Sequence, residues 1–478
     1  MKIVKHLLVY ILVLLLSFFI TLTRWGLAQF GNVNFDEILF QLRTPILSTE
    51  ENILKVFFYN ALVPAIITSI IVFIVIVFIY KFLTKKKKFT LRKIFIIILI
   101  IISICIPIVC LNKFDFFQYL EVQMTNSKFI EKNYVDPSDV EIKFPKEKKN
   151  LIFLYLESYE SSFLSKDLGG VKNTNLLEPM TKITKENVNF SDTKKIGGAR
   201  GVYGTSWTSA AIMSMSCGIP LKLRISYKTM EDNAIGIGDI LEKEGYNQEW
   251  MMGSDARFGN RESFIRRHGN FKIEDYYTLK DEGKIDKDYK EWWGVEDKTL
   301  LKLAKNELKQ LSSKDKPFNF TLLTSNTHVQ DGYTDKSCKK KYKDPYSNSV
   351  YCNAEEVNEF LRWVQKQDFY KDTVIVISGD HLTMQNHYFK KKDKRRIYNL
   401  IINGPDTKRN TDKEFSTLDM FPTTLAALGV EIEGNRLALG TNLYSNEKTL
   451  MEKYGYKKFD KELSYRSKYY LDTFRGVR

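Results

Sequence analysis

The sequence predicts a three-layer α/β domain with a mainly parallel central sheet, preceded by three transmembrane helices. The stretches Lys149–Ser158 and Asp372–His381 each contain a short run of β-branched and large apolar residues. Such runs are typical of strands in a parallel sheet that helices cover on both faces. The N-terminal region contains three further apolar runs, each near the roughly 20 residues that a membrane-spanning helix needs.

Both predicted strands lead into side chains that bind divalent metal ions. Glu157 follows the first apolar run, and Asp380 and His381 follow the second. Open α/β sheets carry their chemistry just beyond the carboxyl ends of the strands. Two such strands side by side would therefore bring these three side chains around one divalent cation. The sequence thus predicts a metalloenzyme, although mixed carboxylate and imidazole ligands do not select one metal.

The three N-terminal apolar runs are Leu7–Thr21, Ala61–Tyr80 and Ile94–Leu111. The first is also compatible with a signal peptide cleaved at the small residues 26–28. However, Arg24 and Trp25 separate this run from the small residues, and two more spans follow. We therefore expect a retained first span.

Basic residues predict the orientation of the spans in the membrane. The short loop between the second and third runs contains Lys81, Lys85, Lys86, Lys87, Lys88, Arg92 and Lys93. Because Lys and Arg accumulate on the cytoplasmic side, this loop is predicted to be cytoplasmic. The loop 24–60 and everything after Leu111 are then predicted to lie outside.

These observations divide the chain into three expected parts. Residues 1–112 form the transmembrane region, residues 113–149 a polar linker, and residues 150–478 one catalytic domain. The formal net charge is +15, but no nucleic-acid-binding motif accompanies it. A basic surface suits anionic lipid headgroups, so we expect the lipid bilayer, and not nucleic acid, as a partner.

Two cysteines support an oxidising location. Cys338 and Cys352 flank a polar loop rich in Lys, Pro and Ser, and a disulfide could close that loop. Two unrelated thiols are the alternative. Cys217 has no evident partner in the sequence, and we expect it to be buried.

A glycine-rich approach precedes a predicted helix between the two metal-bearing strands. Gly197, Gly198, Gly201 and Gly204 lead into small and apolar residues at helical spacing from Ser206 onward. Gly218 and Pro220 are expected to end this helix. Thr205 would then lie at a helix N-terminus, where free backbone N–H groups favour an anion such as a phosphoryl oxygen. On the residues alone, a simple capping role for Thr205 is equally compatible.

The order Glu157, Thr205, Asp380, His381 and the local sequences resemble the alkaline phosphatase and sulfatase superfamily. The resemblance is closest to the membrane-bound phosphoglycerol transferases: the lipoteichoic acid synthases and the enzymes that add phosphoglycerol to periplasmic glucans. It implies a sulfatase-like fold over the whole extracytoplasmic part. It also implies that Thr205 is the nucleophile and, with Glu157, Asp380 and His381, a metal ligand. Thr208, in the same Gly-Thr-Ser-Trp-Thr stretch, is the competing candidate.

The resemblance assigns further residues to substrate binding. Arg261 closes a Phe-Gly-Asn-Arg stretch that resembles a Phe-Trp-Asn-Arg motif of lipoteichoic acid synthases, and a guanidinium can clamp phosphate. Gly259 stands where that motif has Trp, so contacts to the headgroup or acceptor are expected to differ. His328 is expected to contact the transferred group and to exchange a proton. His387 is expected to line the pocket, and His268 to be structural.

The resemblance implies that phosphoglycerol passes from phosphatidylglycerol to a glycan or polymer acceptor through a phosphoglyceryl-threonine intermediate. One divalent cation is expected, Mn²⁺ with Mg²⁺ or Zn²⁺ as alternatives. The implied location is the bacterial inner or cytoplasmic membrane, with several spans and an extracytoplasmic catalytic domain. The alternative is a phosphoethanolamine transferase, or another phosphodiesterase or hydrolase of the sulfatase family. The small number of histidines and cysteines disfavours the phosphoethanolamine transferases.

Overall fold

The computed structural model describes residues 2–30, 35–41, 51–222, 233–385, 388–390, 392–405 and 412–474. The chain divides into two compact units: residues 1–39 and 49–121 belong to the first, and residues 40–48 and 122–478 to the second. Each unit is described separately below.

The first unit is helical. Its helices are α1 (Lys2–Phe30), α2 (Phe35–Gln41), α3 (Glu51–Phe57), α4 (Val63–Lys85), α5 (Phe89–Asn112) and most of α6 (Phe116–Met124), with the π-helical turn Phe58–Leu62 between α3 and α4. Three stretches are long and apolar enough to cross a membrane: Val4–Gln29, Leu54–Lys85 and Phe89–Asn112. Their large apolar side chains are mostly exposed, as expected for helices whose surroundings are lipid. The three predicted spans are therefore confirmed as helices of membrane-spanning length.

The second unit is built on a sheet of seven strands in the order β3-β8-β7-β2-β6-β4-β5. The strands are β2 (Asn150–Leu156), β3 (Gly198–Ala199), β4 (Asn247–Met252), β5 (Phe271–Glu274), β6 (Phe318–Leu323), β7 (Thr373–Gly379) and β8 (Ile397–Ile402). All pairs are parallel except β7 with β8 and β8 with β3. The predicted mainly parallel sheet is confirmed.

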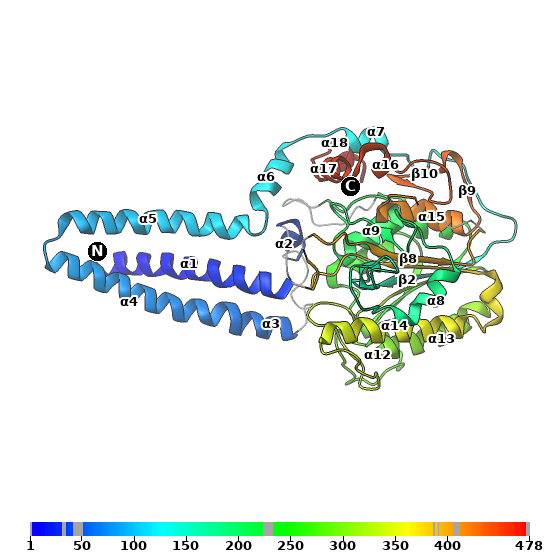
Figure 1. Ribbon diagram of the computed structural model, residues 1–478, viewed down its shortest axis with the longest axis horizontal. Coiled ribbons are helices and arrows are strands. Elements are labelled where there is room, and N and C mark those ends of the chain that lie inside the picture. The colour runs from blue at the N-terminus through cyan, green and yellow to red at the C-terminus, as the bar shows by residue number, and fades with distance from the viewer. Residues whose placement is uncertain are drawn as a thin grey trace. The chain divides into compact units, whose positions relative to one another are not determined.

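Helices cover both faces of this sheet, giving three layers (Figure 1). On one face lie α9 (Thr208–Cys217), α10 (Ile237–Lys243), α11 (Arg261–Arg267) and α15 (Met420–Ala427). On the other lie α8 (Glu178–Glu186), α12 (Tyr276–Asp281), α13 (Asp297–Ser312) and α14 (Pro345–Val364). Alternate residues of β2 feed the two cores: Phe153 packs with the first set and Leu154 with the second. This alternation is the period-2 geometry of a strand.

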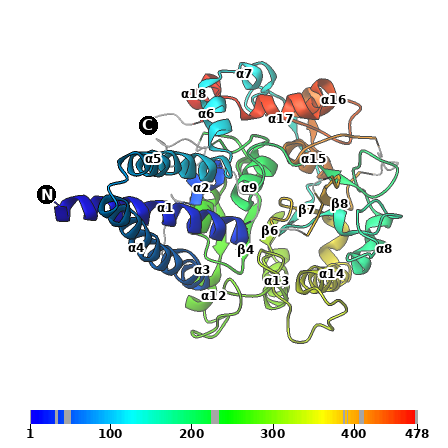
Figure 2. The same cartoon turned by 60° about the vertical axis from the view of Figure 1, so that its left-hand side comes forward.

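Smaller elements complete the unit. Two short antiparallel pairs join β1 (Ile142–Lys143) with β9 (Glu431–Ile432) and β10 (Arg436–Leu437) with β11 (Gly440–Thr441). Four helices gather near the C-terminal end of the chain (Figure 2): α7 (Phe129–Asn133), α16 (Leu450–Tyr454), α17 (Tyr456–Ser464) and α18 (Lys468–Phe474).

The register of β2 against β7 sets the position of the predicted ligands. Leu156 pairs with Gly379, so both strands end at the same level of the sheet. The Asp380 N–H continues the ladder by donating to the Leu156 carbonyl at 3.0 Å. A Cβ at position 379 would lie 1.9 Å from the Tyr159 carbonyl oxygen, so only glycine allows this close approach.

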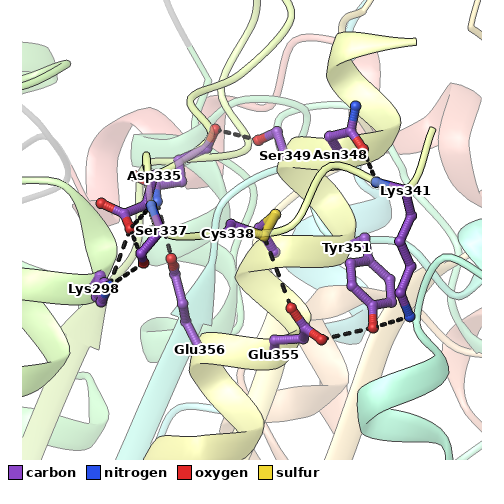
Figure 3. The surroundings of a disulfide bond; sticks show 12 residues. Lys298, Asp335, Ser337, Cys338, Lys341, Asn348, Ser349, Tyr351, Glu355 and Glu356 are labelled. Atoms are coloured by element: carbon purple, nitrogen blue, oxygen red, sulfur yellow. Dashed lines mark hydrogen bonds and ion pairs between the residues drawn. A yellow bond between two sulfur atoms is a disulfide. The ribbon is translucent and has the colours of Figure 1, made fainter. Parts of the chain in front are cut away.

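A disulfide joins Cys338 to Cys352, as the sequence predicts, with 6.0 Å between the Cα atoms. It links the loop before α14 to a residue in the middle part of that helix (Figure 3). The Asp344 side chain caps α14 by accepting from the Ser347 N–H at 2.7 Å, and Pro345 occupies the first turn. Cys217 is buried, as expected.

Breaking this disulfide should lower the stability of the second unit. For a loop of this length the chain-entropy model gives a loss of about 2–4 kcal/mol. The Cys338→Ala/Cys352→Ala double variant should unfold at a lower temperature than the wild type in a thermal melt. Reductant should lower the wild-type midpoint by a similar amount and leave the double variant unchanged. Equal midpoints for wild type and variant without reductant would contradict this.

Candidate active site

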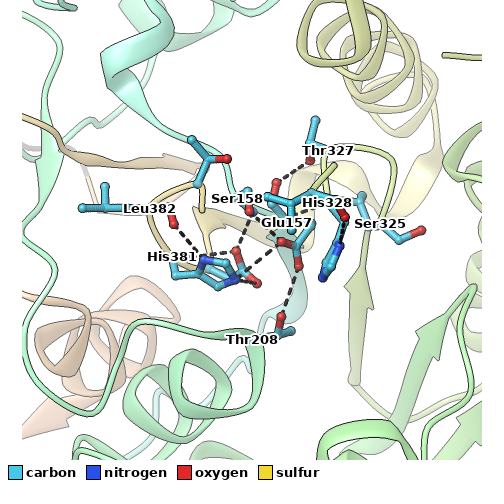
Figure 4. Close-up of polar contacts among 12 residues, drawn as sticks. Glu157, Ser158, Thr208, Ser325, Thr327, His328, His381 and Leu382 are labelled. Carbon is cyan, nitrogen blue, oxygen red and sulfur yellow. Dashed lines mark hydrogen bonds and ion pairs between the residues drawn. The ribbon is translucent and has the colours of Figure 1, made fainter. Parts of the chain in front are cut away.

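Glu157, Asp380 and His381 meet at the carboxyl ends of β2 and β7, where the sequence predicts them. All three are buried, and each offers a ligand atom within 4.8 Å of the others. His381 Nε2 lies 3.5 Å from Glu157 Oε1 and 3.5 Å from Asp380 Oδ2 (Figure 4). The sheet register thus brings together residues that are more than two hundred positions apart.

Hydrogen bonds fix the orientation of each of these groups. Asp380 Oδ1 accepts from the backbone N–H groups of Ser158 and His381, both at 2.7 Å. His381 Nδ1 lies 2.9 Å from the Leu382 carbonyl, which can only accept, so Nδ1 carries a proton. The Nε2 atom therefore faces the two carboxylates. Asp380 Oδ2 is buried and has no hydrogen-bond partner within the described residues.

The electrostatics of the cluster are those of a cation site. Burial raises the pKa of Asp380 to about 8, and the nearby Glu157 charge adds to the rise. Burial acts to raise the pKa of Glu157, but interactions with His381 and His328 and hydrogen bonds with Ser158 and Asp380 together outweigh it, and the net shift is downward. Two carboxylates, one of them with an orphaned oxygen, and an imidazole Nε2 match the donor set of a divalent cation. These residues fit such an ion.

Thr208 places a hydroxyl on this cluster. It is the first residue of α9, and its Oγ1 donates to Glu157 Oε2 at 3.1 Å (Figure 4). No side chain caps this end of the helix. The N–H groups of the first turn therefore point toward the same region, where a helix N-terminus favours negative charge.

Thr205 is oriented differently from our expectation. Its hydroxyl donates to the Val202 carbonyl at 2.8 Å and accepts from the Val202 N–H at 3.2 Å, within a buried turn. The expected helix start at Ser206 is wrong by two residues, because Trp207 is extended and α9 begins at Thr208. Gly218 ends the helix in the left-handed conformation, as expected. Of the two threonines, the geometry favours Thr208 beside the cluster.

The Phe-Gly-Asn-Arg stretch lies against the start of α9. Ser209 Oγ donates to the Gly259 carbonyl at 2.8 Å, which ties this stretch to the residue next to Thr208. Arg261 is buried and donates to the Phe258 and Asp255 carbonyls and to Ser254 Oγ. Burial lowers the pKa of Arg261 to about 10, while the charges of Glu157 and Asp380 oppose that shift. The guanidinium therefore remains a cation within electrostatic reach of the cluster.

The other histidines differ in their surroundings. His328 is half-buried after β6, and its ring lies 4.7 Å from that of Trp293, edge to face. Its Nδ1 lies 2.6 Å from the Val329 carbonyl, so Nε2 is left for other partners. His268 is buried, with Nδ1 3.2 Å from Asp239, on α10. His387 lies outside the described residues.

Two contributors were not found from the sequence. Trp293 lies between His328 and Phe258, at ring distances of 4.7 and 5.3 Å. Buried Tyr346 is within hydrogen-bond distance of the Thr327 carbonyl and of Thr383 Oγ1, so it joins the loops that carry His328 and His381. Neither position has a local pattern that separates it from ordinary aromatic packing.

The sequence profile described as Sulfatase matches residues 149–430. Phosphoglycerol transferase I of Salmonella choleraesuis (strain SC-B67) is 28% identical over 320 residues, which are 63% of this chain and 40% of that protein. The chain therefore spans well under two thirds of the length of this relative.

Solved structures share the fold. An alkaline phosphatase superfamily protein from Vibrio parahaemolyticus has a TM-score of 0.52 at 21% identity, over 67% of this chain and 76% of its own. The lipoteichoic acid synthase LtaP from Listeria monocytogenes has a TM-score of 0.50 at 19% identity, over 64% of this chain and 79% of its own. These similarities support the three-layer α/β architecture of the second unit.

Asp380→Asn should weaken binding of Mn²⁺ to the full-length protein by more than about 100-fold, because it removes an anionic ligand of the site. Isothermal titration calorimetry would measure the affinity. Asp368→Asn is the matched control, since Asp368 is exposed, lies in the turn before β7 and is not one of the residues that gather at the site. Equal Mn²⁺ affinity in wild type and Asp380→Asn would refute the assignment of the site.

Proposed function

The chain belongs to the sulfatase family, and we propose that it transfers phosphoglycerol from phosphatidylglycerol to a glycan or polymer acceptor. The contact that carries the proposal is the hydrogen bond from Thr208 to Glu157 at the start of α9. It places a nucleophilic hydroxyl beside a cation site and a helix N-terminus, an arrangement suited to phosphoryl transfer. The name of the relative, Phosphoglycerol transferase I, supports phosphoglycerol as the transferred group.

The proposed reaction has two steps. Thr208 Oγ1 loses its proton and bonds to the phosphorus as the bond from phosphorus to the diacylglycerol oxygen breaks, and the diacylglycerol oxygen takes up a proton. A phosphoglyceryl-threonine remains. An acceptor hydroxyl then bonds to the phosphorus, loses its proton and releases Thr208 as the free alcohol.

Glu157 and His328 are suited to the proton transfers. The Glu157 carboxylate already accepts the hydrogen bond of Thr208, which aligns the hydroxyl oxygen for attack. In the neutral ring His328 carries its proton on Nδ1, bonded to the Val329 carbonyl. Its Nε2 can then accept a proton from an entering hydroxyl and, once protonated, donate one to a leaving oxygen.

Arg261 is proposed to stabilise the transferred phosphate. Its Nε and one terminal nitrogen donate hydrogen bonds to the Phe258 and Asp255 carbonyls and to Ser254 Oγ. That leaves the other terminal nitrogen for a phosphoryl oxygen. The three fixed donors would hold the guanidinium plane in place before substrate arrives.

Glu157, Asp380 and His381 would hold one divalent cation, which we propose to be Mn²⁺, with Mg²⁺ or Zn²⁺ as alternatives. A cation bound there would supply positive charge for the phosphoryl oxygens and for the attacking oxygen.

The proposed location is the outer face of the bacterial inner or cytoplasmic membrane, with three spans. The lysine cluster between α4 and α5 supports a cytoplasmic loop there. The Cys338–Cys352 disulfide supports an oxidising environment for the second unit. Membrane anchoring of the chain is consistent with a lipid donor.

Thr208→Ala should lower diacylglycerol release from phosphatidylglycerol by at least about 1000-fold, as expected for loss of a nucleophile. Mass spectrometry of the wild type incubated with phosphatidylglycerol should find a glycerophosphate adduct on the peptide that contains Thr208. Phosphatidylethanolamine in a parallel incubation tests the phosphoethanolamine alternative.

Thr205→Val is the matched control, because it keeps the side-chain shape and loses only the hydrogen bonds to Val202. It should lower the thermal midpoint and retain turnover within about 10-fold, since the lost bonds are worth about 1–3 kcal/mol of stability. If Thr205→Val loses activity and Thr208→Ala keeps it, Thr205 is the nucleophile and the assignment to Thr208 is wrong.

A further inference from the structure

Helix α6 (Phe116–Met124) presents an exposed apolar face immediately after the last candidate membrane span. We propose that this helix lies in the headgroup layer of the membrane, with the side chains of Phe117, Leu120 and Met124 inserted among the lipids. The proposal concerns where the chain leaves the bilayer and does not depend on the reaction at the active site.

The covalent structure keeps α6 close to the bilayer. Helix α5 ends at Asn112 and α6 begins at Phe116, so three residues separate them. The four Cα–Cα steps from Asn112 to Phe116 reach at most about 14 Å. The polar interfacial layer on each side of the hydrocarbon core is roughly 5–8 Å thick. The start of α6 therefore cannot lie far beyond the lipid headgroups if α5 spans the membrane.

The exposed face of α6 is apolar. Phe117 is 44% exposed, Leu120 38% and Met124 77%. Their spacing of three and four residues places them on one side of a helix. Exposed Glu121 and Gln118 lie along one edge of this stripe. This is the amphipathic pattern of a helix that lies in the membrane interface.

The opposite side of α6 already has a partner. The rings of Phe116 and Tyr119 lie 4.8 and 5.0 Å from that of Phe35, on α2. Tyr119 and Val122 are each only 7% exposed. The stripe of Phe117, Leu120 and Met124 is thus a second apolar face, separate from the one that packs on protein.

Backbone hydrogen bonds hold the far end of α6. The Arg466 N–H lies 3.3 Å from the Val122 carbonyl and 2.9 Å from that of Thr125, and the Ser127 N–H donates to the Arg466 carbonyl at 2.8 Å. These bonds fix the last residues of α6 and the turn that follows it. We infer that the lipid bilayer covers this stripe, because the bilayer would already surround the exposed apolar side chains of the adjacent helix α5.

Photo-crosslinking of the unmodified full-length protein tests this. The protein would be placed in nanodiscs that contain a phosphatidylcholine with a diazirine near the top of one acyl chain. Peptide mass spectrometry should find lipid adducts on α6 at Phe117, Leu120 or Met124, as well as on α5. An identical sample kept in the dark is the control and should carry none. Adducts on α5 without any on α6 would overturn the proposal.

Spin labels add a measure of depth. Cysteines would replace Phe117, Leu120, Met124 and, as the control, Gln118, after Cys105, Cys110 and Cys217 are changed to alanine. Labels at the first three positions should collide more with oxygen than with a water-soluble nickel chelate, whereas the label at 118 should favour nickel. Nickel preference at all four positions would refute membrane insertion. Low collision with both reagents at position 120 would instead indicate a protein contact and overturn the proposal.

Discussion

The parallel pairing of β2 with β7 is the constraint on which the site depends. The Leu156–Gly379 register ends the two strands together, and the bond from the Asp380 N–H to the Leu156 carbonyl extends it one step further. A shift of one residue would turn Glu157 or Asp380 to the other face of the sheet. Gly379 makes this register possible because Tyr159 passes directly over it. Packing of the whole second unit therefore decides the distance between the ligands.

Loops beyond the strands are held by a second set of contacts. Tyr346 joins Thr327 to Thr383, and Thr327 Oγ1 donates to the Glu157 carbonyl. The Thr383 N–H donates to Glu160, and Arg395 donates to both Glu160 and the Thr383 carbonyl. The loops after β2, β6 and β7 are thus one connected network. Such support keeps reacting groups in place without loss of entropy at each turnover.

The sequence was sufficient where local pattern carries the information. Apolar runs of strand length, membrane-length apolar helices and two cysteines around a polar loop predicted the sheet, the candidate spans and the disulfide. Acidic and histidine residues after two strands predicted the trio of Glu157, Asp380 and His381. The position of Thr208 was not decided in this way, because the start of α9 depends on the extended backbone of Trp207. The parts played by Trp293 and Tyr346 depend on chain segments that meet only in the folded state.

A comparison of two buried acidic clusters indicates which one suits a cation. Glu249, Glu274 and Glu307 also bring their carboxylates together, but Lys272 and Lys284 form ion pairs with them. Those ammonium groups compensate the buried charge and would repel a metal ion. Glu160, near the active site, is likewise neutralised by Arg395. Among the described residues, only His381 forms an ion pair with Glu157 or Asp380. Because buried carboxylates need a compensating charge, this cluster is the one proposed to hold a divalent cation.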